Sequence, residues 1–183
     1  MTAPGLVVWI TGLSGVGKTT VSRATADRIA AQGVPPVLLD GDRLRAALPD
    51  ARGYDPASRR TLAECYARLA LEFSSQGHLV LCSTISLFHS IHSWNRSHFP
   101  AYLEVWLRAP LAELRGRRAG LLHAAGADHA GSAAVVGLDI PAEFPLCPDL
   151  VIDNCGETTA ADAADEVYAA IHRRTGAAHR EAR

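Results

Sequence analysis

Lysine is almost absent from this chain: of its 18 basic residues, Lys18 is the only lysine and the others are arginines. A lysine kept alone indicates a position where arginine cannot serve. An ammonium is a compact charge on a flexible stem and fits between the oxygens of two phosphates, whereas a planar guanidinium is broader. The composition therefore points to Lys18 as a phosphate-binding or catalytic residue.

Charge imbalance, paired cysteines and long apolar runs are also missing. The formal net charge is −1, which argues against nucleic acid or an anionic membrane as a partner. The four cysteines form no Cys-x-x-Cys pair, so no zinc or redox motif is visible. Dispersed thiols, without a signal peptide or a long apolar run, predict a protein of the reducing cytoplasm.

The hydrophobic pattern predicts an α/β fold. Hydrophobic residues make up 48 % of the chain, enough for a core without disulfides or structural metal. Short apolar runs alternate with helical stretches, which predicts a five-stranded parallel sheet covered by helices on both faces. The expected strands are Leu6–Thr11, Val37–Asp40, His78–Thr84, Tyr102–Leu107 and Leu150–Asp153. The expected helices are 21–31, 56–75, a stretch ending at Phe99, 111–118 and 158–173.

Lys18 lies in the segment Gly-Leu-Ser-Gly-Val-Gly-Lys-Thr, which has the G-x-x-x-x-G-K-[ST] spacing of a P-loop (Walker A motif). A strand-like run precedes the loop and a helix follows it, so bound phosphates would meet the positive end of the helix dipole. The loop predicts a nucleotide site, with the Thr19 hydroxyl on Mg²⁺. Its expected residues are Gly12, Leu13, Ser14, Gly15, Val16, Gly17, Lys18, Thr19 and Thr20.

Two carboxylates end the second expected strand in the sequence Asp40-Gly41-Asp42. Open α/β sheets bind ligands at this rim. We expect Asp42 to accept the proton of an attacking hydroxyl and Asp40 to hold Mg²⁺ or its waters. The alternative is an ordinary surface turn. No apolar strand ends in an obvious Walker-B aspartate, which increases the need for this pair.

Residues 119–146 interrupt the alternation, being rich in Ala, Gly and His without a sustained period. Such segments are functional lids or disordered. Because this one follows Arg115 and Arg117, we predict a lid that brings these arginines to the nucleotide. A single domain is expected over residues 1–174, with a disordered tail over 175–183.

Several segments together resemble adenylylsulfate (APS) kinases over residues 6–154. They are Trp9–Thr20, Leu39–Arg45, Gly53-Tyr54, Arg59, Ile85-Ser86, and Gly137–Asp139 with Pro141. Such kinases move the γ-phosphoryl group of ATP to the ribose 3′-hydroxyl of adenylylsulfate. The resemblance implies a P-loop kinase fold, ATP, Mg²⁺, a nucleotide-like acceptor and often a homodimer. It also implies that Asp42 is the base and that Arg45 and Arg59 contact the acceptor. The rest of the implied acceptor wall is Ile85, Ser86, Phe88, His89, Val136 and Gly137.

The departures from the family pattern fall on the acceptor side. Leu62 and Glu64 replace an Asn and an Arg, His89 replaces an Arg, and Val135 replaces a base-stacking Phe. These changes predict a different nucleotide acceptor, such as cytidine diphosphoramidate, whose neutral amide stands where sulfate would be. The alternatives are adenylylsulfate itself or a non-catalytic nucleotide-binding module.

Three histidines, His89, His92 and His98, lie in the stretch that ends at Phe99. A metal site there lacks a third ligand at convincing spacing. A solvated or acceptor-lining face is the favoured interpretation, with His89 as a titratable phosphate contact.

Overall fold

The computed structural model describes residues 4–48, 53, 55–124, 136–137 and 140–181. Within these ranges five strands form an all-parallel sheet in the order β2-β3-β1-β4-β5. The strands are β1 (Val7–Thr11), β2 (Val37–Asp40), β3 (Val80–Ser83), β4 (Tyr102–Arg108) and β5 (Leu150–Asp153). The helices are α1 (Lys18–Ala30), α2 (Gly41–Ala47), α3 (Pro56–Ser75), α4 (His89–His98), α5 (Leu111–Ala124) and α6 (Ala160–Glu181). The α/β parallel-sheet prediction is confirmed.

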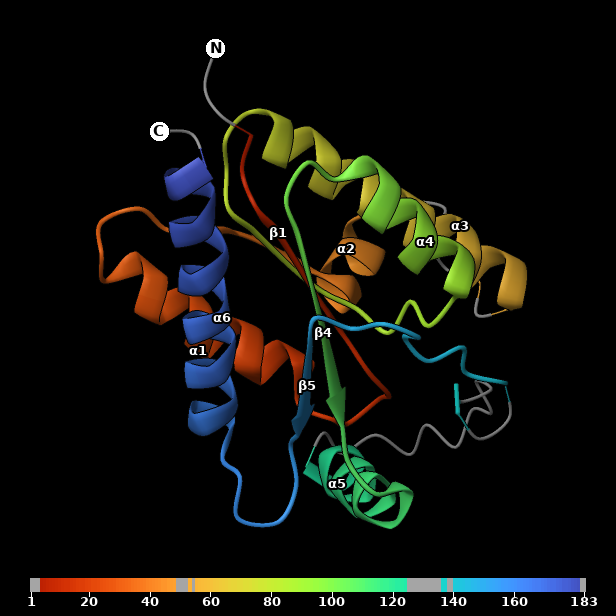
Figure 1. Cartoon of the computed structure of the whole chain (residues 1–183). Coiled ribbons are helices and arrows are strands. Elements are labelled where there is room, and N and C mark those ends of the chain that lie inside the picture. Colours follow the sequence, from red (N-terminus) through yellow and green to blue (C-terminus); the bar gives the residue numbers. More distant parts are fainter. Residues whose placement is uncertain (1–3, 49–52, 54, 125–135, 138–139, 182–183) are drawn as a thin grey trace.

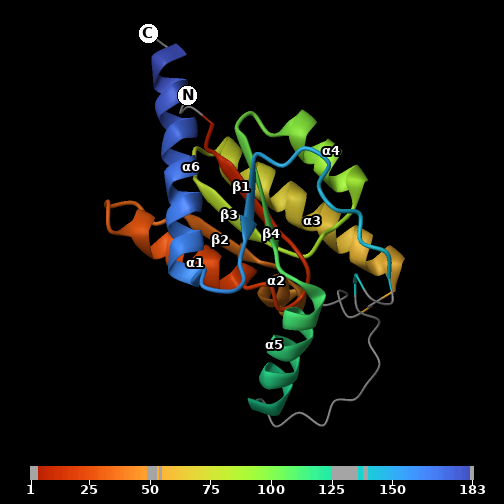
Figure 2. The ribbon, with the colours of Figure 1, turned by 60° about the horizontal axis from the view of Figure 1, so that its bottom comes forward.

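The central strand β1 is buried on both faces, because side chains alternate along a strand. Val8 and Ile10 join the hydrophobic core under α1 and α6. Val7 and Trp9 join the second core under α3 and α4. Figure 1 shows these two helix pairs on opposite sides of the sheet, and Figure 2 shows α5 projecting beyond the end of β4.

Parallel register brings the carboxyl ends of all five strands to one edge. Residues of β1 pair with residues of β3 on one side and of β4 on the other. The loop after β1 therefore lies at the middle of that edge. The segments that follow β2 and β3 lie beside it, which gathers Asp40 and Thr84–Ser86 around the P-loop.

Two elements differ from the sequence-based expectation. The Asp40-Gly-Asp42 segment is not a simple turn: α2 begins at Gly41, and the Asp40 carboxylate caps it by accepting from the amides of Asp42 and Arg43. This is standard N-cap chemistry. At the other end of the chain α6 continues to Glu181, beyond the expected helix end at residue 173. Good helix formers on both sides of Gly176 explain the extension.

The expected lid lies partly outside the described residues, which omit 125–135, 138 and 139. Its first residues, up to Ala124, continue α5. No helix in the described part of the chain is long and apolar enough to cross a membrane.

The packing predicts a large cost for truncating the core of the sheet. Leu81 of β3 is fully buried, so Leu81→Ala should lower the free energy of unfolding by about 2–5 kcal/mol through lost burial and a cavity. Val34 is 76 % exposed, so Val34→Ala should change it by less than about 0.5 kcal/mol. Urea denaturation of both variants measures the difference; equal effects would contradict this packing.

Candidate active site

The P-loop turns sharply between β1 and α1, and two of its glycines are needed for the close approach. Gly12 has φ 148°, and a Cβ there would lie 2.3 Å from the carbonyl oxygen of Leu107. Gly17 has φ 93°, and a Cβ there would lie 2.6 Å from Asn154 Nδ2. No side chain caps the first turn of α1. The amides of that turn are therefore available to an anion.

Asn154, which was not predicted from the sequence, holds this loop through a hydrogen bond. It follows β5 directly and is 5 % exposed. Its Nδ2 donates to the Val16 carbonyl oxygen at 2.7 Å. Its own carbonyl oxygen accepts from Arg117 Nη2 at 2.9 Å. Asn154 thus connects the P-loop to α5. Its position directly after an expected strand is the sequence feature that could have identified it as a site residue.

The Lys18 ammonium is held inside the site. Nζ donates to the Leu13 carbonyl oxygen at 2.9 Å. Burial lowers the pKa of Lys18 to about 8, and the negative charges of Asp42 and Asp40 oppose that shift. A bound phosphate would stabilise the charged form of this buried ammonium, which lacks a full counter-charge.

Asp40 and Thr19 form a pair of oxygen donors beside Lys18. Thr19 Oγ1 donates to Asp40 Oδ2 at 2.7 Å, and Ser83 Oγ lies 3.5 Å from the same oxygen. Burial acts to raise the pKa of Asp40, but the hydrogen bonds from the Thr19 hydroxyl and the Arg43 and Asp42 amides outweigh it and lower the pKa. Asp40 is therefore a carboxylate at neutral pH.

This donor set fits Mg²⁺, which prefers oxygen ligands and keeps several waters. No cluster of three or more His, Cys, Asp or Glu side chains suited to a metal occurs among the described residues. One carboxylate and one hydroxyl, completed by water and substrate phosphate, is the arrangement that these side chains allow.

A cavity of about 870 Å³ joins the P-loop to the rest of the strand edge. Lys18 and Thr19 line one end, Arg45 and Arg59 line the other, and Asp42 is also part of its wall. The remaining wall includes Ser14, Gly15, Thr20, Leu62, Tyr66, Ile85, Ser86, Phe88, Arg117, Val136 and Asn154. Its volume lies in the range of ligand pockets. It brings together most of the residues that the sequence assigned to the site.

The end of the cavity lined by Arg45 is held by hydrogen bonds to main-chain carbonyls. Arg45 Nη1 donates to the Gly53 carbonyl oxygen at 2.8 Å. Tyr66 donates its hydroxyl proton to the Gly41 carbonyl oxygen at 2.8 Å, which joins α3 to α2. Thr11 Oγ1 donates to the Ile85 carbonyl oxygen at 2.5 Å, which joins β1 to the segment after β3.

Some expected site residues do not line the cavity. Arg115 is exposed on α5, whereas Arg117 lines the cavity and pairs with Glu113 at 2.6 Å. Val16 is fully buried, and Gly12 lies against β4. Leu13 and Gly137 line a separate apolar cavity of about 430 Å³ beside β4 and α5. The main cavity is therefore not lined by Gly12, Leu13, Val16, Arg115 or Gly137.

The structure shows which of the residues that differ from the family pattern line the cavity. Leu62 lines the cavity, but Glu64 is exposed on α3 and does not. Val135 is outside the described residues. His89 faces the segment that leads to β5: its amide donates to Glu143 Oε2 at 2.5 Å and its Nε2 lies 3.0 Å from the Phe144 carbonyl oxygen. Because Glu64 is exposed and does not line the cavity, its carboxylate does not repel an anion bound there.

A parallel sheet with a P-loop after its central strand, a buried lysine and a nearby aspartate pair together define a P-loop kinase. The family model for adenylylsulphate kinase matches residues 4–153. The chain belongs to the adenylylsulfate kinase family and is an ATP-dependent kinase of that type.

Curated relatives carry two different names. The adenylyl-sulfate kinase of Paraburkholderia xenovorans is 36 % identical over 153 residues, covering 83 % of this chain and 85 % of that protein. The cytidine diphosphoramidate kinase of Campylobacter jejuni is 35 % identical over 149 residues, covering 81 % and 85 %. Among solved structures, the APS kinase of Mycobacterium tuberculosis in complex with AMPPNP and APS superposes with a TM-score of 0.80. It shares 28 % identity and covers 93 % of this chain and 98 % of its own.

The lowered pKa of Lys18 predicts a pH-dependent affinity for ATP. Lys18 is charged below pH about 8 and neutral above it, so ATP affinity should fall above that pH by up to about tenfold per unit. Lys18→Arg keeps its charge over this range and should show a flat profile. Calorimetric titration with ATP between pH 7.5 and 9.5 makes the comparison, and a flat wild-type profile would contradict the prediction.

Proposed function

We propose that this kinase transfers the γ-phosphoryl group of ATP to the ribose 3′-hydroxyl of adenylylsulfate. The observation that carries the proposal is one continuous cavity lined by the P-loop lysine, the Asp40–Asp42 pair and two arginines. A donor nucleotide at the P-loop end and an acceptor at the arginine end would meet near Asp42. The match to the adenylylsulphate kinase model supports the choice of acceptor.

The proposed transfer is in line. P-loop amides and the Lys18 ammonium bind the β- and γ-phosphate oxygens and orient them. Asp42 accepts the hydroxyl proton as the hydroxyl oxygen bonds to the γ-phosphorus and the bond to the ADP oxygen breaks. Thr19 and Asp40 would hold Mg²⁺, which when bound neutralises charge on the β- and γ-oxygens. Positioning and electrostatics supply most of the rate, as in other phosphoryl transfers.

The acceptor end has two cations for a nucleotide that carries an anionic group. Arg45 and Arg59 line the cavity, and guanidinium groups bind phosphate oxygens in a bidentate manner. We assign them to the acceptor phosphate. Ile85, Ser86 and Phe88 form the wall against which the acceptor sugar and base would lie. Arg117 lies at the donor end.

A second candidate acceptor is cytidine diphosphoramidate, and Leu62 is the observation that favours it. The side chain is 6 % exposed and lines the cavity where the family pattern has an Asn. An apolar wall offers no hydrogen bond to an anion, and a neutral amide group costs less to desolvate there than a sulfate. The relative of that name is as similar to this chain as the adenylyl-sulfate kinase is.

The direct test measures ATP consumption with Mg²⁺ and either adenylylsulfate or cytidine diphosphoramidate, with an acceptor-free reaction as control. We expect saturable turnover of adenylylsulfate with kcat/KM of about 10⁴ M⁻¹s⁻¹ or more. A preference for cytidine diphosphoramidate above tenfold would establish the second candidate. ATP binding without turnover of either acceptor would overturn both acceptor assignments.

The assignment of Asp42 predicts a separation between catalysis and ATP binding. Asp42→Asn keeps the size and hydrogen-bonding shape of the side chain but removes the base, so kcat should fall by about 10²–10⁴ while ATP affinity is unchanged. Steady-state kinetics and calorimetry give the two quantities. An equal loss of ATP affinity would instead assign Asp42 to the metal.

A further inference from the structure

Ser86, on the acceptor wall, has a backbone conformation that its neighbours must enforce. Its φ is 26°, and no other non-glycine residue in the described part of the chain has a positive φ. The residue is 6 % exposed and lines the cavity. Residues other than glycine rarely adopt this backbone conformation, and it persists only where surrounding contacts hold it in place.

Three contacts hold Ser86 in place. Its hydroxyl lies 2.8 Å from the hydroxyl of Thr84. Its carbonyl oxygen accepts from the Phe88 amide at 3.0 Å and lies 3.1 Å from His92 Nε2. Because a carbonyl oxygen only accepts, Nε2 carries a proton and donates it. The contact from His92 is the only one of the three that comes from outside the segment 84–88.

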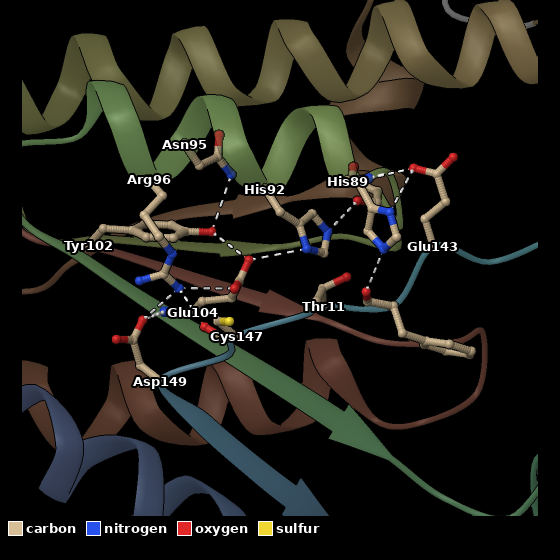
Figure 3. A network of polar contacts seen from close by, with 12 residues as sticks. Thr11, His89, His92, Asn95, Arg96, Tyr102, Glu104, Glu143, Cys147 and Asp149 are labelled. Carbon is tan, nitrogen blue, oxygen red and sulfur yellow. Dashed lines mark hydrogen bonds and ion pairs between the residues drawn. The ribbon is translucent and has the colours of Figure 1, made fainter.

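The other ring nitrogen of His92 lies beside a buried carboxylate. Figure 3 shows the ring on α4 with one nitrogen toward Glu104 of β4. His92 Nδ1 lies 3.2 Å from Glu104 Oε1, and the two side chains are 8 % and 2 % exposed. Because Nε2 carries the proton that the Ser86 carbonyl oxygen accepts, Nδ1 forms an ion pair with Glu104 only when both ring nitrogens are protonated.

Glu104 cannot turn away from His92, because its other contacts are also fixed. Tyr102 donates its hydroxyl proton to Glu104 Oε1 at 3.1 Å. Arg96 Nη2 donates to Glu104 Oε2 at 3.0 Å and also reaches Asp149 Oδ2 at 3.2 Å. The Glu104 amide donates to that same Asp149 oxygen at 2.8 Å. Figure 3 shows Arg96 of α4 and Tyr102 of β4 directed at the carboxylate, with Asp149, just before β5, in contact with Arg96.

The interaction with Ser86 does not require a charged ring. Burial lowers the pKa of His92, and Glu104 and the Ser86 carbonyl oxygen oppose that shift. The neutral tautomer that carries its proton on Nε2 and the imidazolium both donate to Ser86, but only the imidazolium can also donate from Nδ1 to Glu104. The contact therefore persists on either side of this titration.

We propose that His92 is a positioning residue for the acceptor: by donating from Nε2 to the Ser86 carbonyl oxygen, it fixes Ser86 in the conformation that shapes the acceptor wall. The proposal rests on the proposed function, in that the acceptor occupies the end of the cavity lined by Ile85, Ser86 and Phe88. His92 does not line the cavity itself. It acts through Ser86 and is not a catalytic residue.

The test compares three substitutions at position 92. Asn can place its amide nitrogen only near the position of Nδ1, whereas the longer Gln can reach the position of Nε2 and donate to Ser86. Leu removes both donors. We expect His92→Leu and His92→Asn to raise the acceptor KM by about tenfold, while ATP affinity stays within about twofold. His92→Gln should restore the acceptor KM to within about threefold of wild type.

His98→Leu is the matched control, because His98 is an exposed histidine on the same helix that stacks on Trp94. It should leave both constants unchanged. If His92→Leu does not fold, the Asn and Gln variants decide the question. Equal acceptor KM values for these two variants would overturn the proposal, and so would a parallel loss of ATP affinity.

Amide hydrogen exchange gives a readout that needs no turnover. In His92→Leu and His92→Asn, exchange of residues 84–88 should be faster than in wild type, while exchange of the P-loop, residues 12–19, should not change. Unchanged exchange over 84–88 would overturn the proposal. Failure of the proposed function would be recognised separately, as wild-type protein that binds ATP but turns over neither acceptor.

Discussion

A single buried ammonium sets the requirements for the rest of the site. Lys18 lies in a pocket that favours its neutral form, and only the two nearby aspartates oppose this. For Lys18 to bind an anion, its ammonium must lie close to the backbone amides, and no side chain may occupy the place of the anion. The glycines of the loop, the support from Asn154 and the Thr19–Asp40 pair each meet part of that requirement. The central place of β1 in the sheet brings them all to one edge.

The two ends of the cavity are built by different physical means. The nucleotide end depends on main-chain geometry, with tight φ values and an uncapped helix, and few side chains could change it without loss. The acceptor end depends on side chains from α2, α3 and the segment after β3, braced by buried polar groups on α4 and β4. Side chains can be exchanged one at a time. This explains why relatives with one fold carry the names of kinases for different nucleotides.

The sequence predicted the strands and the P-loop well because both depend on local pattern. All five expected strands occur within two residues of their expected bounds. The structure adds what local pattern could not give where the phase of a helix decides which residues reach the cavity. Residues two apart on a helix point to nearly opposite faces, so Leu62 lines the cavity and Glu64 does not, and Arg117 lines it and Arg115 does not. The buried contacts of Asn154 and His92 join segments distant in sequence, and no local pattern reports them.

The cap of α4 comes from a segment more than fifty positions further along the chain. The Glu143 carboxylate accepts from the His89 amide, and the Glu143 amide donates to the Leu87 carbonyl oxygen. Until this segment has left the ribosome, the first turn of α4 has no such partner and the chain around Leu87 lacks a brace. The P-loop also depends on a late residue, because Asn154 donates to the Val16 carbonyl oxygen. Both ends of the cavity therefore mature late in synthesis, and a chain truncated before Glu143 would have neither in its final form.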